Sequence, residues 1–506
     1  MNRSLSQALV KVQDYYRSGN SNAAIQQCRK LIKRFSTSAE PYLLLAKIYQ
    51  SQGHIALVLD VLASAYQKIP NNLSLKLSYG DVCMQAGKYV LASKIYREGM
   101  REQPKQLEWC LRLAAALQES QKTIDDAIAI YQNLIVQQPS EAVFYYNLGT
   151  ALKRQHKFDD TIKAYQQAVT HAPENLQYRM SLCNLFFEMT RFDEAIIEGD
   201  ELLKRNESMP EVLDVLYYSH KKLANYQESL HFAKRLIVVG GSNANSLGAL
   251  ASAQIAMKEY AQAVETCQIA LAETPTNRRI LADQTIALSF DNQVQAAQHI
   301  FDIDKLLSIT EISTPNGYEN IDRFNHAIVH HIETHPTLRF DGLNHTCLGG
   351  ATSDEVFVSP LGPVQQLKDK ILTAVNQYRN SLLLDTSHPW LANLPEQEKL
   401  NLSGWVTRLR TQGYQQGHIH PTAWISGVYY VCLPPVSEKN PEEGGIEFGR
   451  APSYYQGGDQ GATKVVRPVG GTLVLFPSYF YHRTIPFDAA AERFTLAFDF
   501  RKSDFS

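Results

Sequence analysis

The sequence of 506 residues lacks several features that mark particular classes of protein. Its longest apolar runs, such as 472–476, fall far short of the roughly 18 residues that a membrane span needs. Residues 1–4 lead into an amphipathic pattern and do not resemble the apolar core of a signal peptide. The seven cysteines are an odd number without a Cys-x-x-Cys pair, which argues against a disulfide framework. These absences predict a cytoplasmic protein without a membrane span.

The sequence also has no excess of charge of one sign. The formal net charge is −2, so no global positive field attracts nucleic acid or an anionic membrane, and we expect neither as a partner. Apolar residues make up 44% and charged residues 20%, which are ordinary values for a soluble globular protein. A chain of this length is too long for one hydrophobic core, and we expect about two to four domains.

The first 308 residues repeat with a period near 34 and carry almost no strand pattern. Two antiparallel helices approach closely where small side chains meet, an aromatic residue one turn on fills the gap, and proline ends the second helix. The eighth position of the unit is small at Ala46, Gly80, Ala114, Gly149, Cys183 and Ala251. Prolines close successive units at Pro70, Pro104, Pro139 and Pro173.

One unit carries this pattern most fully. It reads Tyr145-Tyr146-Asn147-Leu148-Gly149, followed by Thr161, Tyr165, Ala168 and Pro173, and it resembles the tetratricopeptide (TPR) consensus. We therefore expect residues 1–308 to form an all-α TPR superhelix of eight repeats plus a degenerate ninth. Tyr217 stands where a small residue is expected and predicts a distorted repeat at 210–241.

The TPR resemblance implies a concave surface that binds a peptide or a segment of a protein. Tyr145, Asn147 and Tyr178 are candidates for holding an extended backbone there. The alternative interpretation is that the superhelix is a scaffold or builds a homodimer.

Residues 309–506 have a different pattern. Segments 323–336 and 363–380 are predicted to be helices, and short alternating strands separated by glycine and proline follow Leu400. The predicted strands are 404–410, 425–433, 445–448, 471–476 and 493–500. Short antiparallel strands after two helices predict a double-stranded β-helix, or jelly roll. The whole chain is therefore expected to be a multidomain α + β protein with domains 1–308 and 309–506.

Three histidines in the last hundred residues point to a metal site. His418 and His420 lie two apart, so that on a strand both imidazoles project from one face toward one ion. His482 follows the predicted strand 473–478, and Arg493 comes eleven residues later, opening another strand. Two ligands close together, a distant third and then a basic residue form the order found in 2-oxoglutarate oxygenases.

Longer stretches carry the same resemblance. They are Gly413-Tyr414-Gln415-Gln416-Gly417-His418-Ile419-His420, Ser426-Gly427-Val428-Tyr429-Tyr430, Gly444-Gly445-Ile446-Glu447-Phe448, Phe476-Pro477-Ser478 and Arg493-Phe494-Thr495. In this order they resemble the prolyl-hydroxylase-like 2-oxoglutarate/Fe(II) oxygenases, above all a bacterial subgroup with a His-x-His motif. The resemblance covers roughly residues 310–506 and implies Fe(II), 2-oxoglutarate as cosubstrate and O₂.

The resemblance also implies roles for single residues. His418 and His482 match the two iron-binding histidines of the family. Arg493 matches the basic residue that pairs with the distal carboxylate of 2-oxoglutarate, a task suited to guanidinium. Tyr430 matches a tyrosine that hydrogen-bonds the same carboxylate, and Thr495 is a candidate for a further bond. We expect no catalytic residue beyond the metal site.

His420 departs from most of the oxygenase superfamily, which has Asp or Glu at this position. Three neutral imidazoles leave Fe(II) at a formal charge of +2, one unit more positive than the usual site. Glu442, Glu443 and Glu447 are candidates for a displaced carboxylate, although His420 itself is favoured as the ligand. Three-histidine iron sites also occur in cupin-type thiol dioxygenases, which use no 2-oxoglutarate.

The sequence thus predicts an oxygenase that hydroxylates a protein or peptide side chain recruited by the TPR half. One alternative is a non-catalytic TPR adaptor with a degenerate jelly roll. Another is a three-histidine iron dioxygenase that acts on a small molecule without 2-oxoglutarate. The loop 449–466, rich in Gly, Tyr and Gln, is a candidate lid. The helical run of His326, His330, His331 and His335 is interpreted as a solvated face rather than a zinc site.

Overall fold

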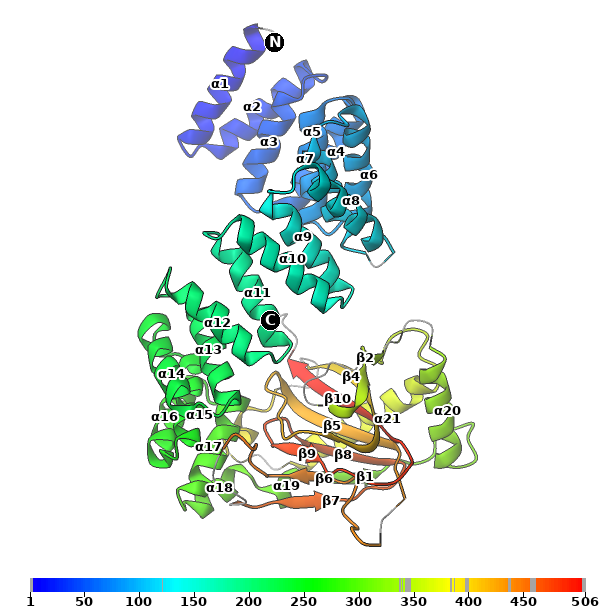
Figure 1. Ribbon diagram of the computed structural model, residues 1–506. Helices are drawn as coiled ribbons and strands as arrows, with labels where there is room; N and C mark the ends of the chain where they lie inside the picture. Colours follow the sequence, from blue (N-terminus) through cyan, green and yellow to red (C-terminus); the bar gives the residue numbers. More distant parts are fainter. Residues whose placement is uncertain are drawn as a thin grey trace. The chain divides into compact units, whose positions relative to one another are not determined.

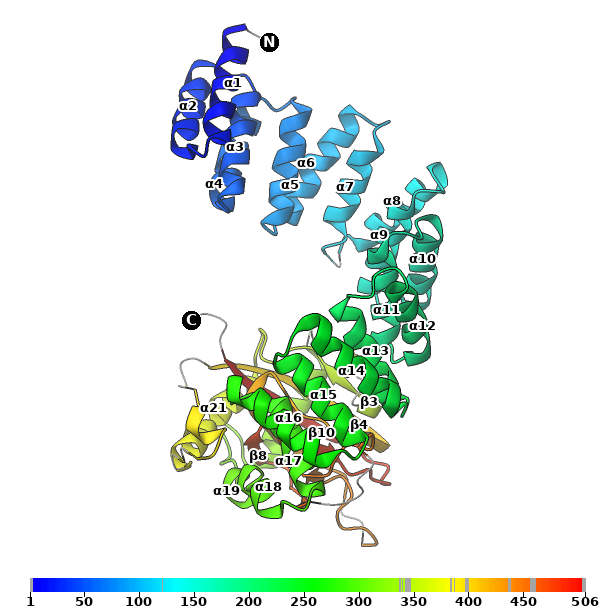
Figure 2. The ribbon, with the colours of Figure 1, turned by 90° about the vertical axis from the view of Figure 1, so that its left-hand side faces the viewer.

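The computed structural model divides the chain into two compact units that meet at Leu185/Phe186, inside helix α11 (Leu176–Glu188). The structure describes residues 3–120, 122–335, 338, 340–341, 347–382, 385, 387–395, 400–435, 438–455 and 461–502. The predicted domain boundary at 308/309 falls inside the first strand, β1 (Ser308–Glu311), directly after the last helix of the repeats, and the division into two domains there stays a prediction. Each compact unit is described in turn (Figures 1 and 2).

The first unit consists of helix pairs with short turns between them. Its helices are α1 (Arg3–Arg17), α2 (Ser21–Arg34), α3 (Glu40–Ser51), α4 (Ile55–Lys68), α5 (Leu73–Gln85), α6 (Tyr89–Glu102), α7 (Leu107–Leu117), α8 (Ile124–Gln137), α9 (Ala142–Arg154) and α10 (Phe158–His171).

Small residues and aromatic rings set how closely these helices pack. A Cβ atom added to Gly80 of α5 would lie 2.3 Å from the ring of Tyr96 in α6. One added to Gly149 of α9 would lie 2.6 Å from the ring of Tyr165 in α10. Only glycine leaves room for the ring at these positions, so the helices touch where the sequence pattern predicts.

The second unit continues the helix pairs up to residue 306 and adds two further helices. Its helices are α12 (Phe192–Leu203), α13 (Pro210–Lys222), α14 (Tyr226–Gly240), α15 (Ala244–Ala256), α16 (Tyr260–Glu273), α17 (Arg278–Phe290), α18 (Val294–Ile300), α19 (Ile303–Leu306), α20 (Ile321–Glu333) and α21 (Pro363–Ser381), with a 3-10 turn at Leu391–Asn393. The helices α13 and α14 are as long as those of other repeats, so the distortion expected from Tyr217 is not seen in the helix bounds.

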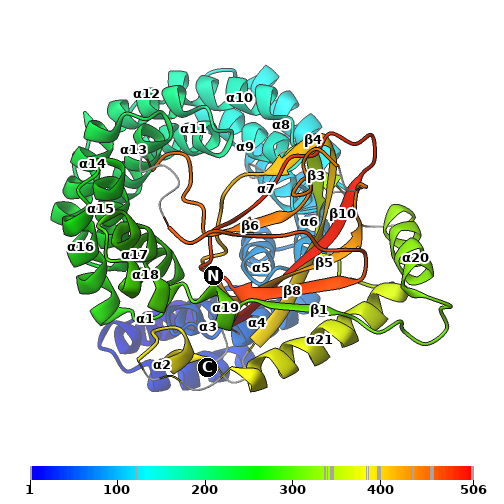
Figure 3. The ribbon, with the colours of Figure 1, turned by 90° about the horizontal axis from the view of Figure 1, so that it is seen from below.

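Two antiparallel sheets form the rest of the second unit (Figure 3). The strands are β1 (Ser308–Glu311), β2 (Phe340–Asp341), β3 (Cys347–Ser353), β4 (Leu400–Gln415), β5 (Ala423–Cys432), β6 (Ile446–Phe448), β7 (Lys464–Val466), β8 (Thr472–Pro477), β9 (His482–Thr484) and β10 (Arg493–Lys502). One sheet has the order β1-β8-β5-β10-β4-β3-β2, and the other has the order β7-β6-β9. The multidomain α + β class is confirmed, whereas jelly-roll winding stays a prediction.

The last repeats and the two sheets share one hydrophobic core. Buried side chains of α17 and α18 belong to the same continuous cluster as those of β5, β8 and β10. Phe301, just after α18, packs on Phe480 with ring centroids 4.3 Å apart. The Tyr479 hydroxyl donates a hydrogen bond of 2.7 Å to the carbonyl oxygen of Ile300. These contacts fix the segment 477–482, which carries one of the three predicted ligands.

None of the described helices combines the length and the apolar character that a membrane crossing needs.

Candidate metal centre and cationic pocket

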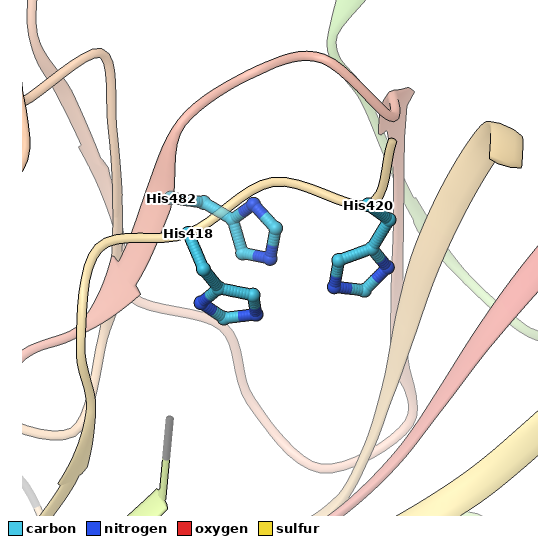
Figure 4. Close-up of side chains that lie close together, drawn as sticks. All are labelled: His418, His420 and His482. Atoms are coloured by element: carbon cyan, nitrogen blue, oxygen red, sulfur yellow. The ribbon is translucent and has the colours of Figure 1, made fainter. Parts of the chain in front are cut away.

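His418 and His420, which follow β4, come together with His482, the first residue of β9 (Figure 4). One ligand nitrogen from each lies within 4.8 Å of the other two. Neighbouring ligands at about 2.1 Å from an ion are roughly 3.0–3.4 Å apart, so ring rotations that bring the three nitrogens closer together place them on one ion. We call these residues the histidine triad. Among the described residues no other group of three or more His, Cys, Asp or Glu is placed to hold a metal.

The backbone explains this convergence, although not in the way the sequence predicts. His418 and His420 lie beyond the end of β4 rather than on a strand. His418 forms an isolated antiparallel bridge with His482, with N–H···O distances of 3.1 Å in both directions. The His420 amide donates to the carbonyl oxygen of Ser478 at 2.9 Å. The extended backbone still places both imidazoles on one side, as two-residue spacing requires.

The second ring nitrogen of each histidine is occupied. Nδ1 of His418 lies 2.7 Å from the carbonyl oxygen of Gln416, and Nδ1 of His482 lies 2.9 Å from that of Phe480. A carbonyl oxygen only accepts, so each Nδ1 carries the proton and Nε2 keeps its lone pair. This is the tautomer that a metal-binding histidine needs.

His420 is oriented by a carboxylate instead. Its Nδ1 lies 2.6 Å from Oδ1 of Asp499, a residue of β10 that is 2% exposed. The same oxygen accepts from the Ser426 hydroxyl at 2.7 Å, and Arg501 reaches Oδ2 at 3.2 Å. Burial raises the pKa of Asp499, but attraction to His420 and these hydrogen bonds outweigh it and hold the pKa below its ordinary value. The triad therefore has an anion directly behind its third member.

Burial keeps the other two histidines neutral. Burial, with a smaller contribution from neighbouring His420, lowers the pKa of His418 to about 4. Burial and the neighbouring triad members hold the pKa of His482 well below its ordinary value. Neutral imidazole is the state that binds a metal. A pocket of about 230 Å³ opens beside His418, His420 and Asp499, with Trp405 in its wall.

Arg493 is buried, and none of the carboxylates that the structure describes forms an ion pair with it. It is 2% exposed, and its Nε donates to the carbonyl oxygen of Gly444 at 3.1 Å. Its Nη1 lies 3.4 Å from the Thr495 hydroxyl, and its guanidinium carbon lies 5.2 Å from the ring centroid of Tyr430. Within the described part of the chain, the buried Tyr430 hydroxyl has no hydrogen-bond partner. The structure thus brings together Arg493, Tyr430 and Thr495.

A second arginine, Arg467, was missed by the sequence analysis. Its Nη2 donates to the carbonyl oxygen of Pro434 at 2.8 Å, whereas its buried Nε and Nη1 have no partner among the described residues. Burial lowers the pKa of Arg467 and of Arg493, and the two cations and Tyr430 influence one another's ionisation. No described carboxylate forms an ion pair with either guanidinium. We call Arg467, Arg493, Tyr430 and Thr495 the cationic pocket.

Glu447 is not available as a displaced metal ligand. Its buried carboxylate is paired with Arg450, at 2.8 Å, and with Arg483. These arginines and their hydrogen bonds lower its pKa although burial alone raises it. Neither Glu442 nor Glu443 joins the described metal-binding group. His420 is thus the residue that lies with His418 and His482.

The predicted lid, loop 449–466, is anchored where the structure describes it, and residues 456–460 lie outside the described residues. The Tyr455 hydroxyl donates to Asp283 of α17 at 2.7 Å and lies 2.6 Å from the Ser252 hydroxyl of α15. The ring of Tyr454 lies 4.9 Å from Nζ of Lys221, a buried residue of α13. Residues 454–455, the tyrosine anchor, are therefore fixed onto the repeats rather than free to open.

Comparison with known families agrees with this site. Residues 403–499 match the family described as "Putative 2OG-Fe(II) oxygenase", and residues 142–175 and 246–279 match tetratricopeptide repeats. The chain thus combines TPR repeats with a C-terminal domain of this oxygenase family. The matched oxygenase segment contains the whole histidine triad and Arg493.

Solved structures similar to this chain include TPR proteins. A TPR protein from Parabacteroides merdae shares 13% identity over 47% of this chain and 94% of its own, with a TM-score of 0.39. The C-terminal part of a TPR protein from Cytophaga hutchinsonii shares 14% over 47% and 98%, with a TM-score of 0.38. YrrB, described as a TPR protein with an unusual peptide-binding site, shares 15% over 34% and 87%, with a TM-score of 0.30. Comparison with curated proteins gives no match.

Proposed function

We propose that this chain is an Fe(II)- and 2-oxoglutarate-dependent oxygenase that hydroxylates a side chain of a protein or peptide. In this proposal the histidine triad binds iron through the three Nε2 atoms, and the cationic pocket binds the distal carboxylate of 2-oxoglutarate. The family match over residues 403–499 supports the class of reaction. The neutral, correctly oriented histidines support the metal.

The bound iron, with 2-oxoglutarate and O₂, supplies the oxidising power that hydroxylates an unactivated C–H bond. The chain's own residues position the reactants. The three histidines fill part of the coordination sphere and leave the rest open to ligands. The guanidinium of Arg493 offers paired N–H donors to a carboxylate, and the protonated Tyr430 hydroxyl, whose pKa is raised by burial, donates beside it. Phe448 and Phe476 pack around the His482 ring and exclude water.

The unpaired donors of the cationic pocket are the structural observation that best supports 2-oxoglutarate as the cosubstrate. A buried polar group without a partner costs roughly 1–3 kcal/mol, and a charged group costs more. Tyr430 Oη and two nitrogens of Arg467 are in this state beside a buried Arg493. A carboxylate removes the cost by accepting from all of them. The same donors would suit any substrate with a carboxylate, and it is the family match over residues 403–499 that favours 2-oxoglutarate as the carboxylate bound here.

Succinate production tests the proposal. The full chain is incubated with Fe(II), ascorbate and 2-oxoglutarate, and succinate is measured with and without added lysate proteins. We expect Arg493→Ala to raise the apparent 2-oxoglutarate constant roughly 30- to 4,000-fold, since losing one partner of a buried charge pair costs about 2–5 kcal/mol. Iron binding should stay nearly unaltered. Arg410→Ala is the matched control, because Arg410 is 76% exposed on β4 and lies outside both sites.

Other results would contradict the proposal in distinct ways. Iron binding without any succinate would favour a TPR adaptor whose oxygenase domain is inactive. Oxygen uptake that does not depend on 2-oxoglutarate would favour a three-histidine dioxygenase of another kind. If alanine at each position of the histidine triad left the metal content unchanged, the histidine triad would not be the metal site.

A further inference from the structure

A polar groove runs along three successive repeats and ends beside the histidine triad. It has a volume of about 730 Å³ and is formed by α13, α15 and α17 together with Pro421. Pro421 follows His420 directly and also lines the pocket of the histidine triad. Arg278 of α17 fixes this junction, because its Nε donates to the carbonyl oxygen of Pro421 at 3.1 Å and its guanidinium lies 5.0 Å from the ring of Trp424.

The charges along the groove follow the repeat. Glu211, Asn245 and Arg279 are spaced by 34 residues each, so they occupy the same position of the first helix in three successive repeats. All three are exposed and line the groove, and the Arg279 guanidinium also lies near enough to Asp283 and Asp214 to interact with their charges. The groove therefore changes from acidic at Glu211, through a neutral amide at Asn245, to basic at Arg279. Asp214 adds a second acidic group at the α13 end.

The tyrosine anchor limits where a ligand can lie. Lys221, Ser252 and Asp283 lie further along the same three first helices, and Tyr454 and Tyr455 cover them. Figure 3 shows the chain after β6 running toward α13. The ends of α13, α15 and α17 at which Glu211, Asn245 and Arg279 lie are left open, on the side of Pro421.

Gly248 lies in the middle of the groove lining, although it is itself buried. It lies inside α15, where glycine costs about 1 kcal/mol relative to alanine. A Cβ atom there would meet Ile280 at an ordinary distance of 3.5 Å, whereas one at Gly80, Gly149 or Gly199 would clash at 2.3–2.8 Å. Packing against α17 thus leaves room for a methyl group at position 248, and the groove lining has its least side-chain cover there.

We propose that this groove binds the substrate of the oxygenase as an extended polypeptide segment with an acidic side chain near the oxidised residue and a basic side chain further along. The reaction rests on the proposed function, but binding to the groove does not. Neighbouring first helices are roughly 10 Å apart and an extended chain rises about 3.3 Å per residue, so one repeat holds about three residues. The acidic and basic side chains are therefore about six residues apart. Arg279 pairs with the acid, Glu211 with the base, and the Asn245 amide bonds the backbone between them.

Charge inversion in the groove tests this proposal with iron and 2-oxoglutarate left out. Fluorescent twelve-residue peptides carry two charges six residues apart, either opposite, both basic or both acidic, in a neutral polar background. The full chain should bind the oppositely charged set best, by roughly fivefold, the upper range for an exposed ion pair. Arg279→Glu should instead bind the doubly basic set best, a gain that a misfolded variant cannot give. Lys234→Glu, an equal charge change on exposed α14 outside the groove, should behave as the unaltered chain.

Filling the groove gives a second measurement. Asn245→Trp adds a bulky side chain at an exposed position of the groove lining and should strongly weaken binding of all three sets, while helical circular dichroism is kept. Equal binding of the three sets, or Arg279→Glu with unchanged preference, would overturn the proposal and point to a small or carrier-bound substrate. Succinate is measured in parallel on the same preparations. Peptide binding without succinate would contradict the proposed function but support the groove as a peptide-binding site. Succinate production without peptide binding would support the proposed function and contradict the groove as the binding site.

Discussion

Position 420 is a histidine, whereas most of the oxygenase superfamily that the chain resembles has a carboxylate ligand at this position. The structure instead places a carboxylate behind the histidine, on the ring nitrogen that does not face the metal site. The Asp499 side chain lies 2.6 Å from Nδ1 of His420 and is itself held by Ser426. A carboxylate behind a metal-binding histidine fixes its tautomer and makes it more basic. With Asp499 counted, the residues around the metal carry the same total charge as two histidines and one carboxylate. The difference is that the carboxylate lies behind a histidine instead of binding the metal directly.

Replacing Asp499 tests this exchange. We expect Asp499→Asn to weaken Fe(II) or Mn(II) binding roughly 10- to 100-fold, because the amide no longer offers an anion to His420. His420→Asp alone should bind metal poorly, since it places two carboxylates side by side. The double variant His420→Asp with Asp499→Asn should bind metal again, because only one carboxylate remains at the site. Calorimetric titration of the metal-free chain measures all four proteins, with exposed Asp488→Asn as control. Unchanged affinity in Asp499→Asn would contradict the role of Asp499.

Sequence reasoning reached the residues that carry a motif and missed those that act through the fold. His418, His420, His482 and Arg493 stand at family spacing. Asp499 is 79 residues from His420, and only the pairing of β10 with β5 brings it near. Arg467 follows the three-residue strand β7 and has no motif around it. Long-range pairing of strands is therefore the information that the single sequence did not contain.

At the scale of elements, the tyrosine anchor joins the sheet domain to the repeats. Glycine and tyrosine in loop 449–466 indicated a mobile lid, whereas the partly buried Tyr454 and the buried Tyr455 pack against α13, α15 and α17. The anchor also explains Tyr217, which stands where the repeat expects a small residue. The Tyr217 hydroxyl accepts from Lys221 at 2.9 Å, and so its ring takes part in the same network.

Lys221 makes this network sensitive to pH. Burial lowers its pKa to about 8 from 10.5, and Tyr217, Tyr218, Tyr454, Asp214, Arg279 and Asp283 are the ionisable groups around it. Between these pH values the unfolded chain keeps a proton that the folded chain has released. The free energy of unfolding therefore rises with pH there, by up to about 1.4 kcal/mol per pH unit. Below about pH 8 the lysine is charged in both states, and its contribution is constant.

Comparison with Lys221→Met isolates this contribution. From pH 8 to 9.5 the stability of the unaltered chain should rise relative to the variant by up to about 2 kcal/mol. Denaturant unfolding is followed by tryptophan fluorescence, since Trp390, Trp405 and Trp424 lie in the second unit. Exposed Lys234→Met is the control. A pH dependence that is the same with and without Lys221 would show that its pKa is not lowered by folding.

Strands were predicted where side chains alternate and missed where pairing alone forms them. The five predicted strands correspond to β4, β5, β6, β8 and β10, with ends that differ by a few residues. β3 contains Gly349 and Gly350, which have low strand propensity, and it forms because it pairs with β4. β1 is a four-residue edge strand held by β8. The period-2 signal is too short in such segments to be recognised.

At the scale of the molecule, the compact unit that contains the oxygenase begins well before the strands. It starts at Phe186 and includes the repeats from α12 onward. One hydrophobic core runs through α17, α18 and the larger sheet. Periodicity identifies where a repeat family ends, but it carries no information about which repeats share a core with the next domain.

Two fragments of the chain should differ in folding. We expect residues 176–506, which keep all of α11, to unfold cooperatively on heating. Residues 309–506 lose the partners of Phe480, Tyr479 and Tyr455 and expose the core that faced α17 and α18. This shorter fragment should aggregate or melt without a cooperative transition, as seen by circular dichroism and size-exclusion chromatography. Cooperative melting of 309–506 at the temperature of the longer fragment would contradict a shared core.

The contact between Asp283 and Tyr455 also restricts how this gene can change over evolutionary time. Solenoids lengthen and shorten by duplication or loss of whole repeats, because each repeat contacts only its neighbours. In the first unit such an event leaves residues after Phe186 untouched. A repeat inserted between α13 and α17 would separate Asp283 or Lys221 from the tyrosine anchor by one repeat and break the network. We therefore expect homologous genes to vary in repeat number at the N-terminal end and to keep the last repeats in fixed number and order.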